Sequence, residues 1–83
     1  MRLSLVDSPR LIAPVPRFTH ITMRVITGDV LLGRDRQTLS DGGGLPVSST
    51  DGLLSIAWDA GEVWMSSTTG TTANVEIVVP GGR

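Results

Sequence analysis

The sequence predicts a small all-β fold, an antiparallel β-sandwich or jelly-roll-like barrel with an extended N-terminal arm. Residues 51–79 hold three short runs of β-forming residues, separated by glycine-centred turns at residues 59–61 and 68–72. Residues 17–26 alternate apolar and polar side chains with a period of two, which is typical of a half-buried strand. No apolar pattern with the 3.6-residue period of a helix extends beyond one turn, so no helix is predicted.

The size of the chain bounds its own stability. Its 83 residues make one domain at most, and such a domain buries only about 60–65% of the surface that its unfolded chain exposes. Small domains usually add disulfides, a metal ion or association with another chain. The sequence has no Cys and a single His, which excludes disulfides and argues against a structural zinc site. Association is the remaining route, and we expect a homo-oligomer or a partner protein.

Charge and hydropathy exclude two other classes of partner. The net charge is -1, and the seven basic residues, all Arg, are scattered along the chain without forming the basic patch of a nucleic-acid-binding protein. An Arg-only composition fits a GC-rich genome and also suits protein interfaces. No stretch approaches the roughly 20 apolar residues that span a bilayer. Asp7, Pro9 and Arg10 interrupt any signal-peptide core, so we expect synthesis in a cytoplasm without export by that route.

The first 16 residues are predicted to form the arm. Residues 2–6 alternate like a short strand, and Pro9, Pro14 and Pro16 then favour extended backbone. The segment is too rich in apolar side chains for a disordered tail. It either buries them on a neighbouring subunit or folds back across its own sheet. The apolar residues concerned are Leu3, Leu5, Val6, Leu11, Ile12 and Val15.

The remaining chain, residues 17–80, is predicted to be the β-sandwich domain, with residues 81–83 as a tail. In residues 17–26 the core face comprises Thr19, Ile21, Met23 and Val25. A tight turn at residues 27–29 leads to a second strand at 30–33, and the two runs are predicted to form a hairpin. Residues 34–50, with the Gly42–Gly44 run, are the least regular part, and a loop of this length is often a binding loop. Part of it is expected to pack against the surface of the domain through Leu39, Leu45 and Val47.

Residues 53–79 are predicted to form a meander of three antiparallel strands, which brings the expected total to five to seven strands. Their apolar positions follow the period of two. The core faces are expected to hold Leu54, Ile56 and Trp58, then Val63 and Met65, then Ala73, Val75, Ile77 and Val79. Trp64 is out of phase with Val63 and Met65, so it should point away from the core. An outward Trp is either an anchor in a subunit contact or a platform on which a sugar stacks.

No pattern for chemistry is present. His20 lies in the middle of a predicted strand without a nucleophile-elbow motif elsewhere. The Gly42–Gly44 run lacks the Gly-Lys-Ser/Thr of a phosphate-binding loop. A single calcium site among Asp35, Asp41 and Asp51 is a minor alternative, since the alternate oxygen ligands of an EF-hand are missing. We therefore expect a protein that is not an enzyme, with no catalytic residue, cofactor or metal site.

From residue 25 onward, the order of these signals resembles a group of small β-rich structural proteins of tailed bacteriophages. Their pattern runs through a strand ending in V-x-L-G, a polar glycine loop, a G-x-P-L/V element and a hydrophobic strand. It ends with D/N-A-G-E/D-hydrophobic-aromatic, small polar residues with Gly and a final x-V-x-V/I strand. The matching segments are residues 30–33, 43–47, 53–56, 59–64, 69–71 and 74–77, and the resemblance as a whole extends over about two-thirds of the chain. Trp64 stands where that family has Tyr, and the N-terminal segment has no counterpart.

The resemblance implies a virion structural protein, a capsid decoration, cementing or minor head protein made in the host bacterial cytoplasm. Such proteins bind an assembled shell by surface complementarity, often as trimers. The expected partners are the major capsid protein or other virion proteins, and the expected contact residues are Leu3, Leu5, Val6, Leu11, Ile12 and Trp64. The alternative is a glycan-binding module of a phage tail fibre or adhesin, which would use the glycine-rich loop and Trp64.

Overall fold

The structure, a computed structural model, describes residues 2–15, 19–68 and 70–78 and is mostly β: two four-stranded antiparallel sheets packed as a sandwich. Sheet A has the order β1 (Arg2–Leu5), β8 (Ala73–Val78), β3 (Thr19–Thr27), β6 (Leu54–Trp58). Sheet B has the order β2 (Arg10–Pro14), β7 (Glu62–Ser67), β4 (Asp29–Gly33), β5 (Leu45–Ser48). The prediction of a sandwich is confirmed, whereas the alternative of a closed barrel is wrong.

The predicted hairpin and meander are wrong, because consecutive strands cross between the sheets instead of pairing with each other. β3 pairs with β6 and β8 in sheet A, whereas β4 pairs with β5 and β7 in sheet B. Likewise β6, β7 and β8 have no mutual pairing. Of the consecutive strands described, β4 and β5 alone are neighbours in one sheet. A tight turn at residues 27–29 reverses the chain in either case, so the turn signal does not reveal which sheet the next strand enters.

The extended N-terminal arm is also wrong, because its residues are strands of the sandwich. β1 pairs antiparallel with β8, so that Leu3 lies opposite Val75, and β2 pairs with β7. Leu5 is 2% exposed and belongs to the core. The alternative in which this segment folds back onto its own domain is therefore the one found. Pro14 fits here because β2 is an edge strand, where a missing N–H on the outer side breaks no ladder.

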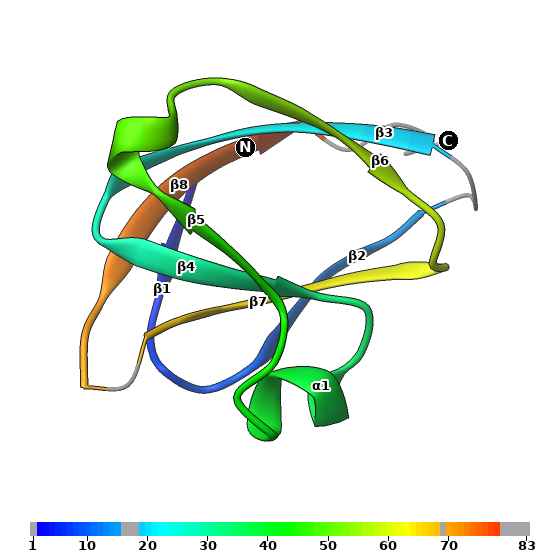
Figure 1. Cartoon of the computed structure of the whole chain (residues 1–83), viewed down its shortest axis with the longest axis horizontal. Coiled ribbons are helices and arrows are strands. Elements are labelled where there is room, and N and C mark those ends of the chain that lie inside the picture. The colour runs from blue at the N-terminus through cyan, green and yellow to red at the C-terminus, as the bar shows by residue number, and fades with distance from the viewer. Residues whose placement is uncertain (1, 16–18, 69, 79–83) are drawn as a thin grey trace.

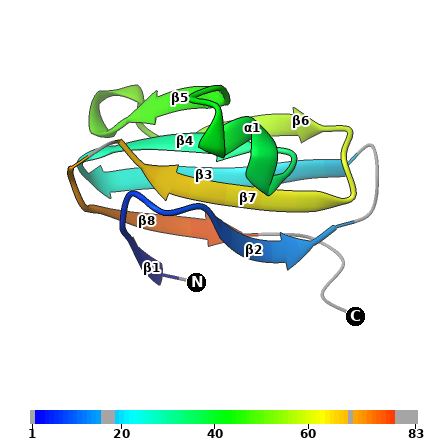
Figure 2. The same cartoon turned by 90° about the horizontal axis from the view of Figure 1, so that it is seen from below.

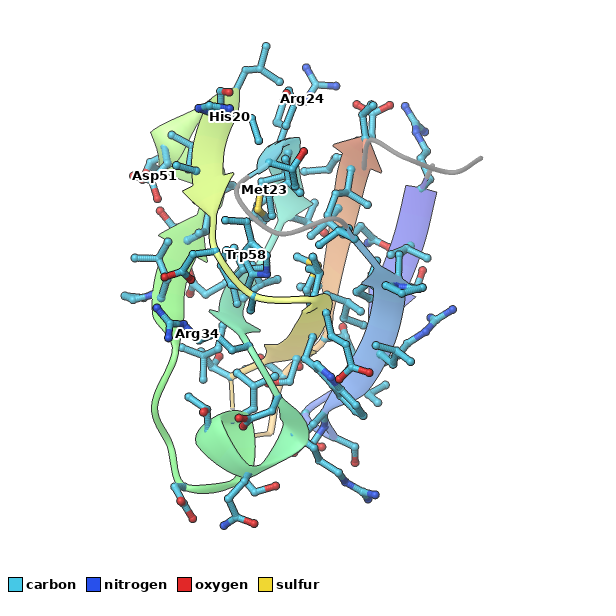
Figure 3. The ribbon with its side chains drawn as sticks, turned by 90° about the vertical axis from the view of Figure 1, so that its right-hand side faces the viewer. His20, Met23, Arg24, Arg34, Asp51 and Trp58 are labelled. Carbon is cyan, nitrogen blue, oxygen red and sulfur yellow. The ribbon has the colours of Figure 1, made fainter. Side chains whose placement is uncertain are left out.

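The core lies between the two sheets and follows the predicted alternation. In β3, Ile21, Met23 and Val25 are buried, and Figure 3 shows Met23 and Trp58 in the interior, with Arg24 on the outside. Trp58 is buried, and its indole Nε1 donates to the carbonyl oxygen of Glu62 at 2.8 Å. The inward residues of the last two strands are also buried as predicted, namely Val63, Met65, Ala73, Val75 and Ile77.

Residues 34–50, predicted to be an irregular loop, contain regular elements. The prediction that the chain has no helix is therefore wrong. Its first part is a one-turn helix, α1 (Arg36–Ser40), whose N-cap Asp35 accepts a hydrogen bond from the Thr38 N–H at 2.7 Å. The chain continues into β5 and a 3₁₀ turn, η1 (Ser49–Asp51). A five-residue helix is too short to show a helical period in sequence. Leu39 and Val47 are buried as expected, whereas Leu45 is exposed.

Some predictions fall outside the described residues: the arm boundary at Pro16, the strand start at Arg17, the core position Val79 and the tail at residues 81–83. In the part that the structure describes, no helix is long and apolar enough to cross a membrane.

Candidate interaction surface

The outward face of sheet A is mostly polar, although Ile26 and Val78 are exposed on it. Glu76 on β8 is held between two guanidinium groups, from Arg2 on β1 at 3.2 Å and from Arg24 on β3. These hydrogen bonds, from Arg2 first and then Arg24, lower the pKa of the Glu76 carboxyl. A parallel row of uncharged groups lies beside them, because Asn74 accepts from the Ser4 hydroxyl at 2.8 Å and donates to Thr27 at 3.0 Å. Side chains on this face are thus largely engaged with one another.

The outward face of sheet B is apolar by contrast. Leu11 on β2 lies directly opposite Trp64 on β7, and Leu31 on β4 lies opposite Pro46 on β5. Leu11 is 43% exposed, Pro46 is exposed, and Leu31 and Trp64 are half-buried. Figure 2, viewed from the side of α1, shows β2, β7, β4 and β5 side by side in this sheet. We call the surface formed by Leu11, Leu31, Pro46 and Trp64 the sheet-B face.

Helix α1 packs beside the sheet-B face through Leu39. This side chain is buried but lies outside the core cluster between the sheets. A Cβ atom at Gly33 would come within 2.8 Å of Leu39 Cγ, and one at Gly44 within 2.9 Å of Leu39 Cδ2. Gly44 also has a φ of 106°, which favours glycine. The two glycines therefore leave the space that Leu39 fills, and this packing holds the helix against sheet B.

Trp64 is oriented within its own strand. Its indole Nε1 donates to the Glu62 carboxylate at 2.9 Å, two residues earlier on the same face of β7. Its other neighbours are Leu11 and Gly33, which has no side chain. The polar atom of the indole is thus satisfied within the chain, and the ring, half-buried beside Leu11, offers an apolar surface.

The predicted contact residues separate into two groups. Leu5 is buried in the core, and Leu3 and Ile12 are half-buried against it, so these three serve the sandwich itself. Val6 is 57% exposed and lies in the connection between β1 and β2. Leu11 and Trp64 are the two that the structure brings together. Sequence reasoning missed Leu31 and Pro46, although Leu31 is out of phase with buried Val30 and Leu32, just as Trp64 is with its neighbours.

The aspartates considered for calcium are used separately for local structure. Asp35 caps α1, and its pKa is lowered chiefly by the hydrogen bond from the Thr38 backbone. Asp41 accepts from the Gln37 amide at 2.9 Å, and Asp51 accepts from the Ser48 N–H at 2.8 Å. Among residues 2–15, 19–68 and 70–78, no three His, Asp or Glu side chains gather as metal ligands would.

The glycine-rich loop, Gly42–Gly44, closes the C-terminal end of α1 through backbone hydrogen bonds. The N–H of Gly42 donates to the Leu39 carbonyl at 3.1 Å and that of Gly43 to the Thr38 carbonyl at 2.9 Å. His20 is exposed on the outer side of sheet A (Figure 3), beside a shallow pocket that the Arg34–Asp59 ion pair also lines. The Asp59 carboxylate is paired with the Arg34 guanidinium and not with the His20 imidazole.

Neither protein-family models nor curated proteins nor solved structures give a match to this chain. The function is therefore inferred from the chain's own surfaces. The sheet-B face is the strongest candidate for contact, because it alone among the two outer faces combines exposed and half-buried apolar side chains from all four strands of a sheet.

Proposed function

We propose that this protein is a non-enzymatic structural protein of a bacteriophage virion, a capsid decoration, cementing or minor head protein. In this proposal it docks on a virion protein through the sheet-B face. The N-terminal segment does not act as a free arm, because its strands are part of the sandwich, and it contributes Leu11 to this face. The observation that carries the proposal is the pairing of Leu11 with Trp64 on an apolar outer face. Aromatic and aliphatic side chains of this kind form the centres of protein interfaces.

The strand order supports the same proposal. Eight strands in the orders 1-8-3-6 and 2-7-4-5 correspond to a double-sheet jelly roll, an architecture that recurs in viral capsid proteins and in lectins. Fold alone does not decide function. The fold agrees, however, with the resemblance of residues 30–77 to small phage structural proteins.

The first test is the location of the protein. Particles are purified from a culture that produces the phage, and the chain is quantified by mass spectrometry. We expect it to co-purify with the particles. Hundreds of copies per particle would assign it to the shell, and a dozen or fewer to a vertex, connector or tail. Its absence from complete particles would refute the proposal.

The second test assigns the contact surface. Particles lacking the protein are incubated with purified wild-type chain or with a Leu11→Ser/Trp64→Ser variant, and binding is measured by sedimentation. The control is Val78→Ser, which removes an apolar side chain that is 66% exposed on the outer face of sheet A. We expect the double variant to lose binding by at least about tenfold, since hot-spot truncations cost 2 kcal/mol or more. Equal binding by all three proteins would contradict a role for the sheet-B face.

The same variants address the glycan-binding alternative. A glycan array probed with the wild-type chain and with Trp64→Ala distinguishes the two functions, because a sugar stacks on the indole directly. Silence across the array, together with binding to particles, supports the virion role. A glycan signal that Trp64→Ala abolishes, in a protein absent from particles, would replace it with the alternative.

A further inference from the structure

The four sheet edges differ in how they are protected against pairing with another chain. An edge strand presents unpaired N–H and C=O groups, and proteins block such edges with proline or charged residues. β2 carries Arg10 and Pro14, β5 carries Pro46, and β1 begins at Arg2. β6 has the sequence Leu-Ser-Ile-Ala-Trp, with neither proline nor charge. Among the described strands, β6 is therefore the edge without such a block.

The flank of the sandwich at β6 is also incompletely covered. Leu54 and Ile56 are only half-buried, whereas Ile21 and Met23, their partners on β3, are buried. Leu53, which immediately precedes β6, is 72% exposed. Figures 2 and 3, which view the molecule from two directions, place β5 (green) and β6 (yellow-green) on the same flank. The inner face of sheet A thus remains partly open to solvent along this edge.

The side-chain pattern of β6 is nearly symmetric about its central residue. Large apolar residues at 54, 56 and 58 alternate with small residues at 55 and 57. In an antiparallel pair centred on Ile56, Ile56 faces itself, Leu54 faces Trp58 and Ser55 faces Ala57 of the other copy. Large side chains then meet on the inner face and small ones on the outer face. Asp59 would face Leu53, so no like charges oppose each other.

We propose that β6 pairs antiparallel with β6 of a second copy of this chain, about a two-fold axis that passes between the two Ile56 residues. The pairing joins two A sheets into one continuous eight-stranded sheet. A self-complementary strand matches the isologous contact of a two-fold dimer, in which the same patch serves on both subunits. A strand from an unrelated partner would not require this symmetry, and the second copy is therefore the occupant that the pattern favours.

This dimer has a consequence for docking. The two-fold axis of an antiparallel pair is perpendicular to the sheet, so it keeps both B sheets on the same side. Both sheet-B faces then point toward one surface, and two weak contacts act together as a bivalent one. The inference stands on the β6 edge, not on the proposed function. It predicts a dimer as the assembling unit, in place of the trimer that the resemblance implies.

The first experiment measures association. The full chain is studied by sedimentation velocity over a range of concentrations, and we expect a reversible monomer–dimer equilibrium. Ser55→Lys/Ala57→Lys places like charges opposite each other across the two-fold axis and should weaken dimerisation by about tenfold or more. Ser55→Lys/Ala57→Glu places opposite charges there and should retain it. Ser8→Lys/Ser40→Lys, which adds the same charge at exposed positions elsewhere, should behave like the wild type.

The second experiment tests the register by cross-linking, which is simple because the natural chain has no Cys. Ser55→Cys and Ala57→Cys are made separately and oxidised mildly, alone and as a mixture. Directly opposed residues lie about 4.5–5.5 Å apart between Cα atoms, within disulfide range, whereas diagonal ones lie about 7–8 Å apart. The mixture should therefore give a disulfide dimer faster than either variant alone.

The outcomes separate this inference from the proposed function. A monomer at every concentration, a trimer, or a dimer equally stable in Ser55→Lys/Ala57→Lys would overturn the β6 pairing, even if the protein is abundant in particles. Absence from particles would overturn the virion role and leave the dimer test unaffected. A dimer weakened by like charges, retained with opposite charges and cross-linked fastest in the mixture would establish the pairing.

Discussion

Arg2 and Glu76 form an ion pair at 3.2 Å that joins the beginning of the chain to its last described strand. The main chain reinforces this contact, because Arg2 and Glu76 are also register partners in the β1–β8 ladder. Closing the sandwich thus requires segments more than 70 residues apart to pair. The first strand is thus an integral part of sheet A.

Leu5 and Val6 provide a direct test of the place of β1 in the fold. Leu5→Ala should lower the free energy of unfolding by about 2–4 kcal/mol, because it leaves a cavity in the core. Val6→Ala should change it by less than about 0.5 kcal/mol, since Val6 is 57% exposed. Urea unfolding followed by circular dichroism measures both. Equal, small effects would mean that the first strand does not contribute to the folded domain.

Glu76 predicts how stability depends on pH. Arg2 and Arg24 favour the ionised carboxylate, so the pKa of Glu76 is lower in the folded chain than its usual value of 4.5. A lowered carboxyl pKa gives a stabilisation that is fully present above that usual value and is lost as pH falls below it, through the folded-state pKa. The wild type should therefore lose more stability than Glu76→Gln when the pH is lowered from neutral toward 3.

The matched control removes the cations instead of the carboxylate. Arg2→Met/Arg24→Met should show the same shallower pH dependence as Glu76→Gln. Because these groups are at the surface, the difference from the wild type should shrink at about 1 M salt, where screening acts over about 3 Å. Melting temperatures measured across the pH series report the effect. An unchanged acid dependence in both variants would exclude this ion-pair network as its source.

The two tryptophans are predicted to respond differently to the same substitution. Trp58→Phe removes the donor to the Glu62 carbonyl in a partly buried site and should cost about 1–3 kcal/mol. Trp64→Phe removes an exposed hydrogen bond to the Glu62 side chain and should cost less than about 1 kcal/mol. Denaturant midpoints compare the two variants. A larger loss in Trp64→Phe would reverse the assignment of core and surface roles.

Local side-chain pattern predicted which face of each strand is buried, but it did not predict which strands pair. Ile21, Met23 and Val25 are buried because alternation along a strand is a property of the strand itself. The partner of that strand depends on residues far away, since Val25 pairs with Val75 and Ile21 with Ile56. A turn such as residues 27–29 reverses the chain without selecting a sheet.

The candidate contact surface was predictable to a similar extent. Trp64 was expected outside the core because it is out of phase with Val63 and Met65, and the structure agrees. Its neighbour Leu11 was predicted as a contact residue for another reason, an arm that does not exist. Their proximity arises from the β2–β7 pairing, a long-range contact without a local signal. For Leu39 the contacts are local, but the sequence does not show that Gly33 and Gly44 both lie against its side chain.

Gly33 and Leu39 provide a final prediction. Gly33→Ala places a Cβ about 2.8 Å from Leu39 Cγ and should destabilise the chain by about 1–3 kcal/mol through overpacking. Gly61→Ala is the control, since a Cβ there meets nothing within 4 Å. If Leu39 is the cause, Leu39→Ala should relieve the clash, so the double variant should be less destabilised than the sum of the single ones. Strict additivity, measured by urea unfolding, would show that α1 is not held by this contact.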